Sequence, residues 1–158
     1  MLSHMDKDAR PAMVDVSGKD VTWRTARART RVRLPQGAAA LFRDGELHSA
    51  KGPVFQTAIL AGTMAVKKTS DLIPLCHPLP IEECSITVEG PVEGRVTILC
   101  TVGVHGRTGV EMEALTGASV AALTVYDMCK SLSHDIVIEE TRLLEKRGGK
   151  SDVNAEEP

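Results

Sequence analysis

An acid–base pair stands near the end of a long apolar stretch, where Asp127 and Lys130 lie three residues apart. On a helix this spacing places both side chains on one face, so the carboxylate and the ammonium group can pair. The neighbours of Asp127 are mostly apolar, and such surroundings can shift a pKa into the range useful for proton transfer. The pair is therefore a candidate for acid–base catalysis. The alternative is a surface ion pair, which would contribute little.

Two further segments combine a polar side chain with a constrained backbone. Lys51 precedes Gly52 and Pro53 at the expected start of a helix, where free amide groups and the lysine charge would attract an anion. His77 stands between a cysteine and a proline, and its restricted motion suits proton transfer or a phosphate contact. A solvated lysine and a structural histidine are the alternatives.

Cations also cluster near the end of the chain and along one predicted strand. Residues 146–150 have the sequence Lys-Arg-Gly-Gly-Lys, in which glycines between cations let backbone amides approach a phosphate. A basic flexible tail is the alternative. Residues 26–34 alternate between arginines and small or apolar residues, which predicts a half-buried strand with a solvated basic face. Solvation and protection of a sheet edge explain these arginines most simply. The alternative is that Arg27 or a neighbour reaches an anionic ligand, across a subunit boundary.

The helix that carries Asp127 near its end is predicted to carry Met112 and Glu113 near its start. Fourteen residues separate Glu113 from Asp127, which corresponds to about 21 Å along an α-helix. A compact site within one subunit cannot easily contact both ends. Either the ligand is long or each site is assembled from two subunits. Mixing Asp127→Ala with Lys51→Ala subunits would restore some activity if those two residues reached one site from different chains.

Hydrophobic periodicity, together with glycine and proline, predicts the elements that must position these residues. Adjacent strands should form a hairpin, and helices covering one face of an antiparallel sheet predict an α+β fold of ferredoxin-like type. Strands are expected at 26–34, 84–89, 95–105 and 135–144, helices at 36–43, 53–68 and 109–131, and a stiff proline-rich loop at 72–80.

Composition limits the class of protein. The chain has 158 residues, of which 42% are hydrophobic and 25% charged, which suits one globular domain. A net charge of -2 and 3% aromatic residues argue against nucleic-acid binding by broad phosphate neutralisation or by base stacking. With so few aromatic residues the core must be built from Ala, Val, Leu, Ile and Met, and such a lean core favours additional burial between subunits. The cysteines and histidines match no standard zinc ligand spacing, so no metal site is predicted.

The ends of the chain are predicted to be flexible, at 1–12 and 151–158, around a single domain at 13–150. The polar start lacks the apolar stretch of a secretion signal, and no run is long enough to span a membrane. These features predict a cytoplasmic protein with reduced thiols and no membrane association.

Several motifs resemble one family over nearly the whole chain, from about residue 13 to residue 151. The most specific are S-D-L-I-P-L-C-H-P-L at 70–79 and R-T-G-V-E-M-E-A-L-T at 107–116. With them come M-V-D-V-S at 13–17, Lys51-Gly52, S-V-A-A-L-T-V-Y-D-M at 119–128 and K-R-G-G-K at 146–150. Together they resemble the molybdenum cofactor biosynthesis protein C family, the cyclic pyranopterin monophosphate synthases.

The resemblance implies a fold, an assembly and a reaction. The subunit would be ferredoxin-like and assemble as a homohexamer, a trimer of dimers, with sites at subunit interfaces. It would convert a small nucleotide-derived triphosphate, 3′,8-cyclo-7,8-dihydroguanosine 5′-triphosphate, into cyclic pyranopterin monophosphate and pyrophosphate. No metal or cofactor of its own is expected, and Mg²⁺ could accompany the triphosphate. The rival hypotheses are a non-catalytic nucleotide-binding module and a structural subunit of a larger synthase.

The resemblance also implies roles for individual residues. The catalytic residues would be Asp127, Lys130, Lys51 and His77. The substrate-contacting residues would be Leu75, Cys76, His77, Met112 and Glu113, to which charge alone adds Lys146 and Arg27. Ring opening and closure require proton transfers, and departing pyrophosphate requires cations, so each lysine is a candidate for both roles.

Overall fold

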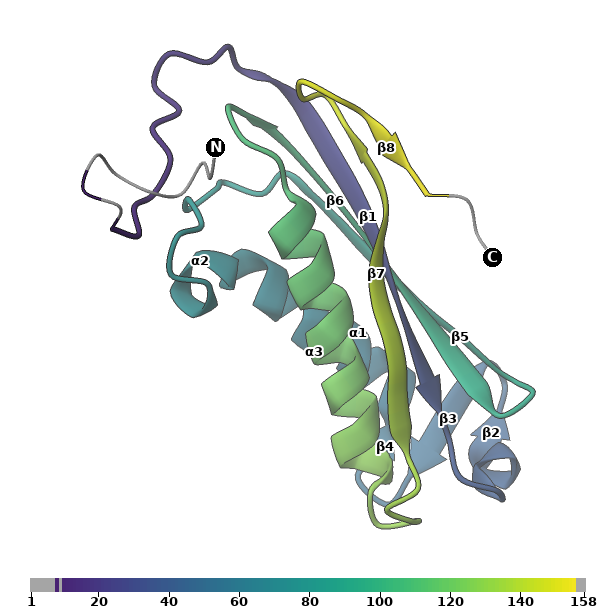
Figure 1. The fold of residues 1–158 in the computed structure, drawn as a ribbon. Coiled ribbons are helices and arrows are strands. Elements are labelled where there is room, and N and C mark those ends of the chain that lie inside the picture. The colour runs from purple at the N-terminus through teal and green to yellow at the C-terminus, as the bar shows by residue number, and fades with distance from the viewer. Residues whose placement is uncertain (1–7, 9, 156–158) are drawn as a thin grey trace.

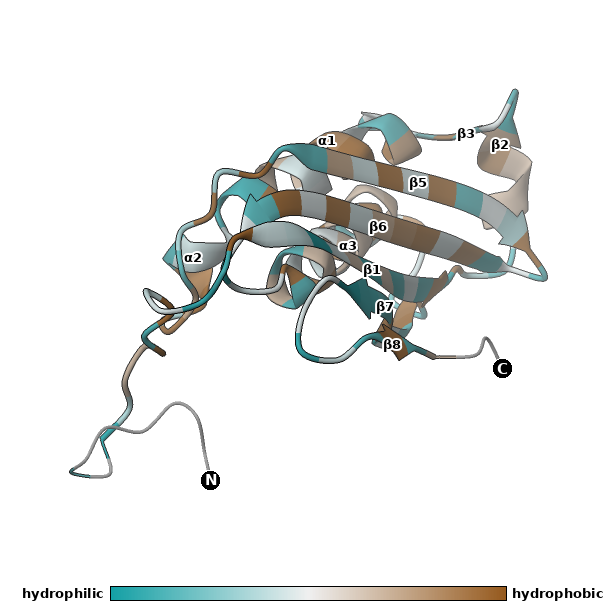
Figure 2. Ribbon diagram, turned by 90° about the horizontal axis from the view of Figure 1, so that it is seen from above, coloured by the Kyte–Doolittle hydropathy of each residue, from teal (hydrophilic) through white to brown (hydrophobic). Residues whose placement is uncertain are grey.

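A computed structural model describes residues 8 and 10–155. The fold is a five-stranded antiparallel sheet in the order β5-β6-β1-β7-β8, with the helices on one face (Figures 1 and 2). The large sheet contains β1 (Thr22–Arg33), β5 (Glu83–Val92), β6 (Arg95–Gly106), β7 (Val137–Arg147) and β8 (Val153–Asn154). The helices are α1 (Val54–Lys67), α2 (Thr69–Leu72) and α3 (Glu111–Cys129), and a small sheet contains β2 (Phe42–Arg43), β3 (Glu46–Ser49) and β4 (Gly52–Pro53). The predicted α+β class, ferredoxin-like sheet and one-sided helical layer are confirmed.

The alternation predicted for the arginine-rich strand is confirmed in β1. Ala26, Ala28 and Val32 are buried in the core beneath the helices, and the intervening arginines project from the other face. The predicted solvated basic face is wrong at Arg29, which is only 2% exposed and donates to Glu140 of β7 at 3.1 Å. The arginines do not protect a sheet edge either, because β1 lies inside the sheet between β6 and β7.

The contact between α1 and α3 depends on two glycines. A side chain at Gly62 would come within 2.8 Å of the Gly117 carbonyl oxygen, and one at Gly117 would come within 2.6 Å of Val66. Small residues at both positions therefore let the helices approach closely. Both helices lie close to the predicted bounds, as does the hairpin of β5 and β6.

The structure corrects the sequence prediction in the short elements. The predicted helix at 36–43 is wrong, because the 3₁₀ turn Ala38–Leu41 and the strand β2 form there instead. Asp44 and Gly45 adopt positive φ angles of 53° and 78°, which form a tight turn that pairs Phe42 with Leu47.

The predicted flexible ends are described only in part. Residues 153–154, which we expected to be flexible, form β8 and pair with Glu145 and Lys146 of β7. Residues 1–7, 9 and 156–158 lie outside the described residues. Within the described part of the chain, no helix is both long and apolar enough to cross a membrane.

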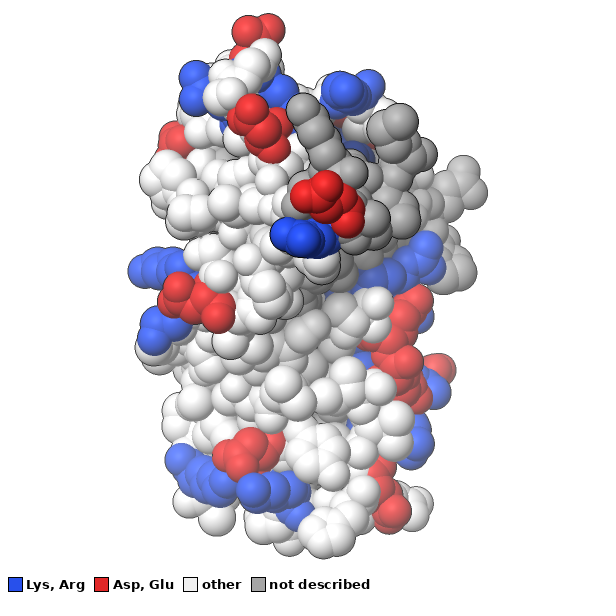
Figure 3. Space-filling view, turned by 60° about the vertical axis from the view of Figure 1, so that its left-hand side comes forward, with Lys and Arg blue, Asp and Glu red and all other residues white. Residues whose placement is uncertain are grey.

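The helical layer has a largely uncharged surface. Viewed from the helical side, the centre of the molecule lacks charged side chains, which gather at the margins (Figure 3). Exposed apolar residues on the helices include Leu60 and Met64 of α1, Leu72 of α2 and Leu123 of α3. Exposed apolar surface of this kind is typical of regions that contact another protein.

Candidate active site

Helix α3 carries candidate residues at both of its ends. Met112 and Glu113 lie in its first turn, whereas Asp127 lies in its last turn beside the small sheet (Figure 1). Because α3 is one continuous helix, Glu113 and Asp127 lie about 21 Å apart along it. The predicted residues therefore fall into two groups, the lysine–aspartate cluster and the His77 pocket.

The lysine–aspartate cluster consists of Lys51, Asp127 and Lys130. The Lys130 Nζ donates to Asp127 Oδ1 at 2.8 Å, and the Lys51 Nζ donates to Asp127 Oδ2 at 2.7 Å. Lys51 also donates to the main-chain oxygen of Asp127 at 2.9 Å. Hydrogen bonds from Lys130 and then Lys51 lower the pKa of Asp127 to about 2, and Asp127 in turn raises the pKa of Lys130. The cluster therefore holds one carboxylate and presents two ammonium groups.

This geometry corrects two sequence expectations. The mostly apolar sequence around Asp127 suggested a pKa tuned for acid–base work, but its side chain is half exposed and its pKa is lowered, so the carboxyl group is a poor proton donor at neutral pH. The arrangement in which Asp127 and Lys51 reach one site from different chains is wrong, because they bind each other within one chain.

The predicted anion site at the start of α1 is also wrong. The amide groups of Phe55 and Gln56 in the first turn of α1 both donate to the carboxylate of Glu46. Lys51 instead lies in the two-residue turn between β3 and β4 and is followed by Gly52 of β4, whose φ of 114° favours glycine. Its side chain extends to Asp127 rather than to the α1 amides.

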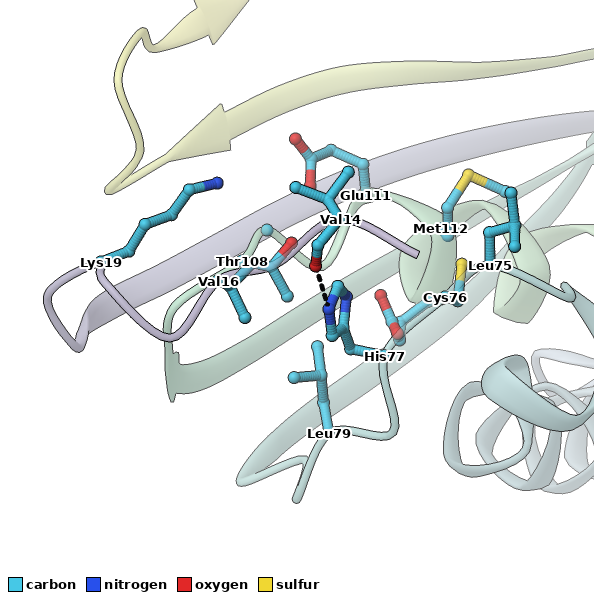
Figure 4. Close-up of a pocket in the computed structure, with 12 residues that line it drawn as sticks. Val14, Val16, Lys19, Leu75, Cys76, His77, Leu79, Thr108, Glu111 and Met112 are labelled. Carbon is cyan, nitrogen blue, oxygen red and sulfur yellow. Dashed lines mark hydrogen bonds between the residues drawn. The ribbon is translucent and has the colours of Figure 1, made fainter. Parts of the chain in front are cut away.

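The His77 pocket lies at the other end of α3 and has a volume of about 320 Å³. Figure 4 shows that its side chains come from the N-terminal segment, the proline-rich loop and the start of α3. Five predicted substrate-contacting residues meet here, namely Leu75, Cys76, His77, Met112 and Glu113. The rest of the lining is Val14, Val16, Lys19, Leu79, Thr108, Gly109 and Glu111.

His77 has a defined proton position. Its Nε2 lies 2.8 Å from the Val14 carbonyl oxygen, which can only accept a hydrogen bond (Figure 4). Nε2 therefore carries a hydrogen, and Nδ1 is left as the ring atom that can accept or return a proton. This arrangement suits a histidine that takes part in proton transfer.

Glu113 is a buried carboxyl group in the same pocket and is only 4% exposed. Burial raises its pKa, a hydrogen bond to its own backbone opposes this, and the charge of Glu111 adds to the increase. Burial, together with the charge of Glu113, also raises the pKa of the Cys76 thiol. A carboxylate in such surroundings gains most from a ligand that donates hydrogen bonds to it.

Lys146 and Arg27 lie on opposite faces of the sheet. The Lys146 Nζ lies 3.2 Å from Glu111 Oε1, which places it at the rim of the His77 pocket. Lys146 pairs in register with Ala26, so the next residue, Arg27, projects to the open face, where it lines a hollow with Leu99 and Thr101. The structure therefore brings Lys146, but not Arg27, to the other candidate residues of this chain.

Sequence reasoning missed several residues that line the pocket. Thr108 and Gly109 belong to the motif at 107–116, within which the sequence predicted substrate contacts only for Met112 and Glu113. Lys19 carried no signal beyond its charge, and it is held by Arg107, whose Nε donates to the Lys19 carbonyl oxygen at 3.0 Å. Only folding brings this N-terminal segment over the start of α3.

We expect the Glu113→Gln variant to gain thermal stability relative to the parent protein as the pH rises. Because the pKa of Glu113 is raised in the folded state, its contribution to stability is fully present below the pKa of the unfolded chain and is lost as the pH rises through the folded-state pKa. Glutamine does not ionise and avoids this loss. Thermal unfolding of both proteins at intervals from about pH 4 to about pH 8 measures the difference, which must grow with pH. A constant difference would contradict the prediction.

Comparisons with known proteins give one consistent result. The model of the MoaC family matches residues 13–149. The chain is 58% identical to the cyclic pyranopterin monophosphate synthase of Xanthomonas oryzae pv. oryzae (strain MAFF 311018), over 98% of this chain and 93% of that protein. It is 57% identical to the synthase of the same name from Xanthomonas axonopodis pv. citri (strain 306), with the same coverage. It is also 49% identical, over 94% of its length, to 26% of molybdenum cofactor biosynthesis protein 1 of Dictyostelium discoideum.

Proposed function

The chain belongs to the MoaC family, and from this membership we infer that it is a cyclic pyranopterin monophosphate synthase of molybdenum cofactor biosynthesis. Its substrate is 3′,8-cyclo-7,8-dihydroguanosine 5′-triphosphate, and its products are cyclic pyranopterin monophosphate and pyrophosphate. The structural observation that carries this assignment is the His77 pocket, where a buried carboxyl group lines one cavity with an imidazole whose Nε2 donates to the Val14 carbonyl oxygen.

We assign the aminopyrimidine part of the substrate to the His77 pocket. The guanine-derived ring presents an N–H and an adjacent amino group, two donors that a single carboxylate can accept together. Glu113 is the buried carboxyl group available for this contact, and Leu75 and Met112 supply apolar walls. His77 Nδ1 then exchanges protons with the ring atoms during opening and reclosure.

We assign the phosphate chemistry to the lysine–aspartate cluster. Closure of the cyclic phosphate requires a sugar hydroxyl oxygen to bond to the α-phosphorus and release its proton to solvent, while the bond from the α-phosphorus to the bridging oxygen breaks and pyrophosphate leaves with its negative charge. The ammonium groups of Lys51 and Lys130 can stabilise that charge and donate a proton to it. Asp127 orients both lysines through ion pairs and raises the pKa of Lys130. Lys146, at the rim of the His77 pocket, adds a further cation.

The two groups serve one substrate if the cluster of one subunit adjoins the His77 pocket of another. The distance along α3 separates them within one chain, whereas a symmetric interface can place the opposite ends of two copies side by side. The exposed apolar residues of the helical layer, among them Leu60 and Leu123, support contacts between subunits. We propose a homohexamer arranged as a trimer of dimers, in which Arg27 could also approach a site through a neighbouring subunit.

The proposed enzyme works in the cytoplasm without a metal or cofactor of its own. Its four cysteines are free thiols, which suits a reducing compartment. Mg²⁺ bound to the triphosphate oxygens is compatible with the mechanism, because phosphate oxygens are the ligands that Mg²⁺ prefers. The partners are the small-molecule triphosphate and other copies of the chain, with no nucleic acid and no membrane.

The function is tested by incubating the purified protein with the cyclic dihydroguanosine triphosphate. We expect cyclic pyranopterin monophosphate and pyrophosphate to form in equal amounts, measured by liquid chromatography with mass spectrometry and by a pyrophosphatase-coupled assay. Triphosphate binding without pyrophosphate release would favour the non-catalytic binding module. A monomer that gains activity only with another polypeptide would favour the structural subunit. Light scattering on the isolated protein measures its mass and so distinguishes that monomer from a homo-oligomer.

A further inference from the structure

The carboxylate of Glu46 binds three backbone amides from two elements. Its Oε1 accepts from the amide of Leu47 and from that of Phe55, both at 2.7 Å. Its Oε2 accepts from the amide of Gln56 at 3.1 Å. Glu46 belongs to β3, whereas Phe55 and Gln56 lie in the first turn of α1. One side chain therefore joins a strand of the small sheet to the start of a helix.

Helix α1 depends on this outside acceptor. Its N-cap residue is Pro53, which makes no side-chain capping hydrogen bond. The first amides of a helix need acceptors, and a negative charge near them is favoured by the helix dipole. Glu46 supplies both the acceptors and the charge from a position nine residues before Phe55.

The segment between these two points of attachment carries Lys51. Ser49 pairs with Gly52 across a two-residue turn, and Ser49 Oγ accepts from the Lys51 amide at 3.1 Å. From this turn Lys51 Nζ reaches both the carboxylate and the main-chain oxygen of Asp127. The β3–β4 hairpin is only two residue pairs long and is barely stable by itself, so its position is set by what anchors it. Its anchors are the pairing of β3 with β2, the buried side chain of Leu47 and the carboxylate of Glu46.

We propose that Glu46 is a positioning residue for Lys51: by tying the β3–β4 hairpin to the first turn of α1, it sets where Lys51 Nζ lies relative to Asp127. Its importance for catalysis rests on the function proposed above for the lysine–aspartate cluster. The alternative is that Glu46 only caps a helix. In that case its loss would lower stability without moving Lys51.

The side-chain titration of Asp127 distinguishes these cases without an activity assay. Carbon-13 NMR of the Asp127 carboxyl group should give a pKa of about 2 in the parent protein, because Lys130 and Lys51 both lower it. In Glu46→Ala that pKa should rise toward the value found in Lys51→Ala, since Lys51 no longer holds its place. In the double variant Glu46→Ala/Lys51→Ala the pKa of Asp127 should equal the value in Lys51→Ala alone. A double-mutant cycle gives this non-additive result when Glu46 acts on Asp127 only through Lys51.

Thr69→Val is the matched control for lost helix stability. Thr69, the first residue of α2, is buried beside the C-terminal end of α1, where its hydroxyl lies 3.1 Å from the carbonyl oxygens of Ala65 and Val66. The substitution should lower the thermal midpoint and leave the Asp127 titration unchanged. If Glu46→Ala does not fold, Glu46→Asp replaces it, because the shorter side chain keeps the charge but cannot reach Leu47, Phe55 and Gln56 together.

Steady-state kinetics add a second readout. Glu46→Ala should lower kcat about tenfold to a hundredfold with little change in KM, the size of effect expected from a displaced catalytic group. Glu46→Gln should retain most of the activity, because its amide oxygen can still accept from Leu47 and Phe55. An Asp127 titration in folded Glu46→Ala or Glu46→Asp that matches the parent protein would overturn the proposal, as would an equal shift in Thr69→Val. Inactive parent protein with the expected titration would leave the positioning role intact and refute the proposed function instead.

Discussion

Replacing Asp127 with asparagine should lower kcat for pyrophosphate release about 10²- to 10⁴-fold, the range for loss of an acid–base or charge-stabilising group. Asparagine has nearly the same shape, but it cannot hold two ammonium groups by charge. Lys51 and Lys130 would then repel each other and leave the positions in which Asp127 Oδ2 and Oδ1 hold them at 2.7 and 2.8 Å. The measurement is steady-state release of pyrophosphate from the cyclic dihydroguanosine triphosphate.

A matched control separates this effect from the general loss of a surface carboxylate. Asp44 is exposed, lies in the turn between β2 and β3 and has a positive φ that asparagine also tolerates, so Asp44→Asn should keep full activity. The Asp127→Asn protein should fold, because the lost ion pairs are half exposed and such pairs contribute little to stability. Parent-like kcat in folded Asp127→Asn would remove Asp127 from the mechanism.

Mixed oligomers of Asp127→Asn and Glu113→Gln subunits should recover about a quarter of the parent activity, although each variant alone is nearly inactive. The estimate assumes random pairing in symmetric dimers: half of the dimers are mixed, and each mixed dimer has one site that contains both intact residues. The physical basis is the length of α3, which keeps Glu113 and Asp127 about 21 Å apart within one chain.

The matched control for this experiment uses residues that act from the same chain. Lys51 and Asp127 are in direct contact, so mixtures of Lys51→Ala and Asp127→Asn subunits should stay inactive. Subunits are exchanged by mild denaturation and refolding, and differently tagged chains are purified together before assay. If verified mixed oligomers of Glu113→Gln and Asp127→Asn subunits recover no activity, the site does not combine Glu113 and Asp127 from two chains.

Much of the fold followed from patterns that extend over many residues. Strict alternation marked β1, and a long run of small and apolar residues marked α3 within two residues of its observed ends. The short elements were missed for the complementary reason. Strands of two to four residues, such as β2 (Phe42–Arg43) and β3 (Glu46–Ser49), are too short to show a period, and they exist only because neighbouring backbone pairs with them.

The composition of the candidate site was predicted better than its geometry. The motifs that resemble the family pointed to His77, Glu113 and Asp127. The fold places His77 and Glu113 in one pocket and Asp127 with Lys51 at the other end of α3. Spacing could not show that Lys51, 76 residues from Asp127, binds it within the same chain. Nor could it show that Glu46 takes the helix amides assigned to an anion.

Local sequence was sufficient for the class of fold, the long helices and strands and the chemical types at the site, because periodicity and motif identity are properties of neighbouring residues. The pKa values of these groups and their division into two clusters were instead decided by contacts between residues distant in the sequence. Asp127 has a lowered pKa because two lysines reach it, and Glu113 has a raised pKa because the chain buries it. Distance between charges and exclusion of water exist only after folding, and these two quantities determine the chemistry that each carboxyl group can perform.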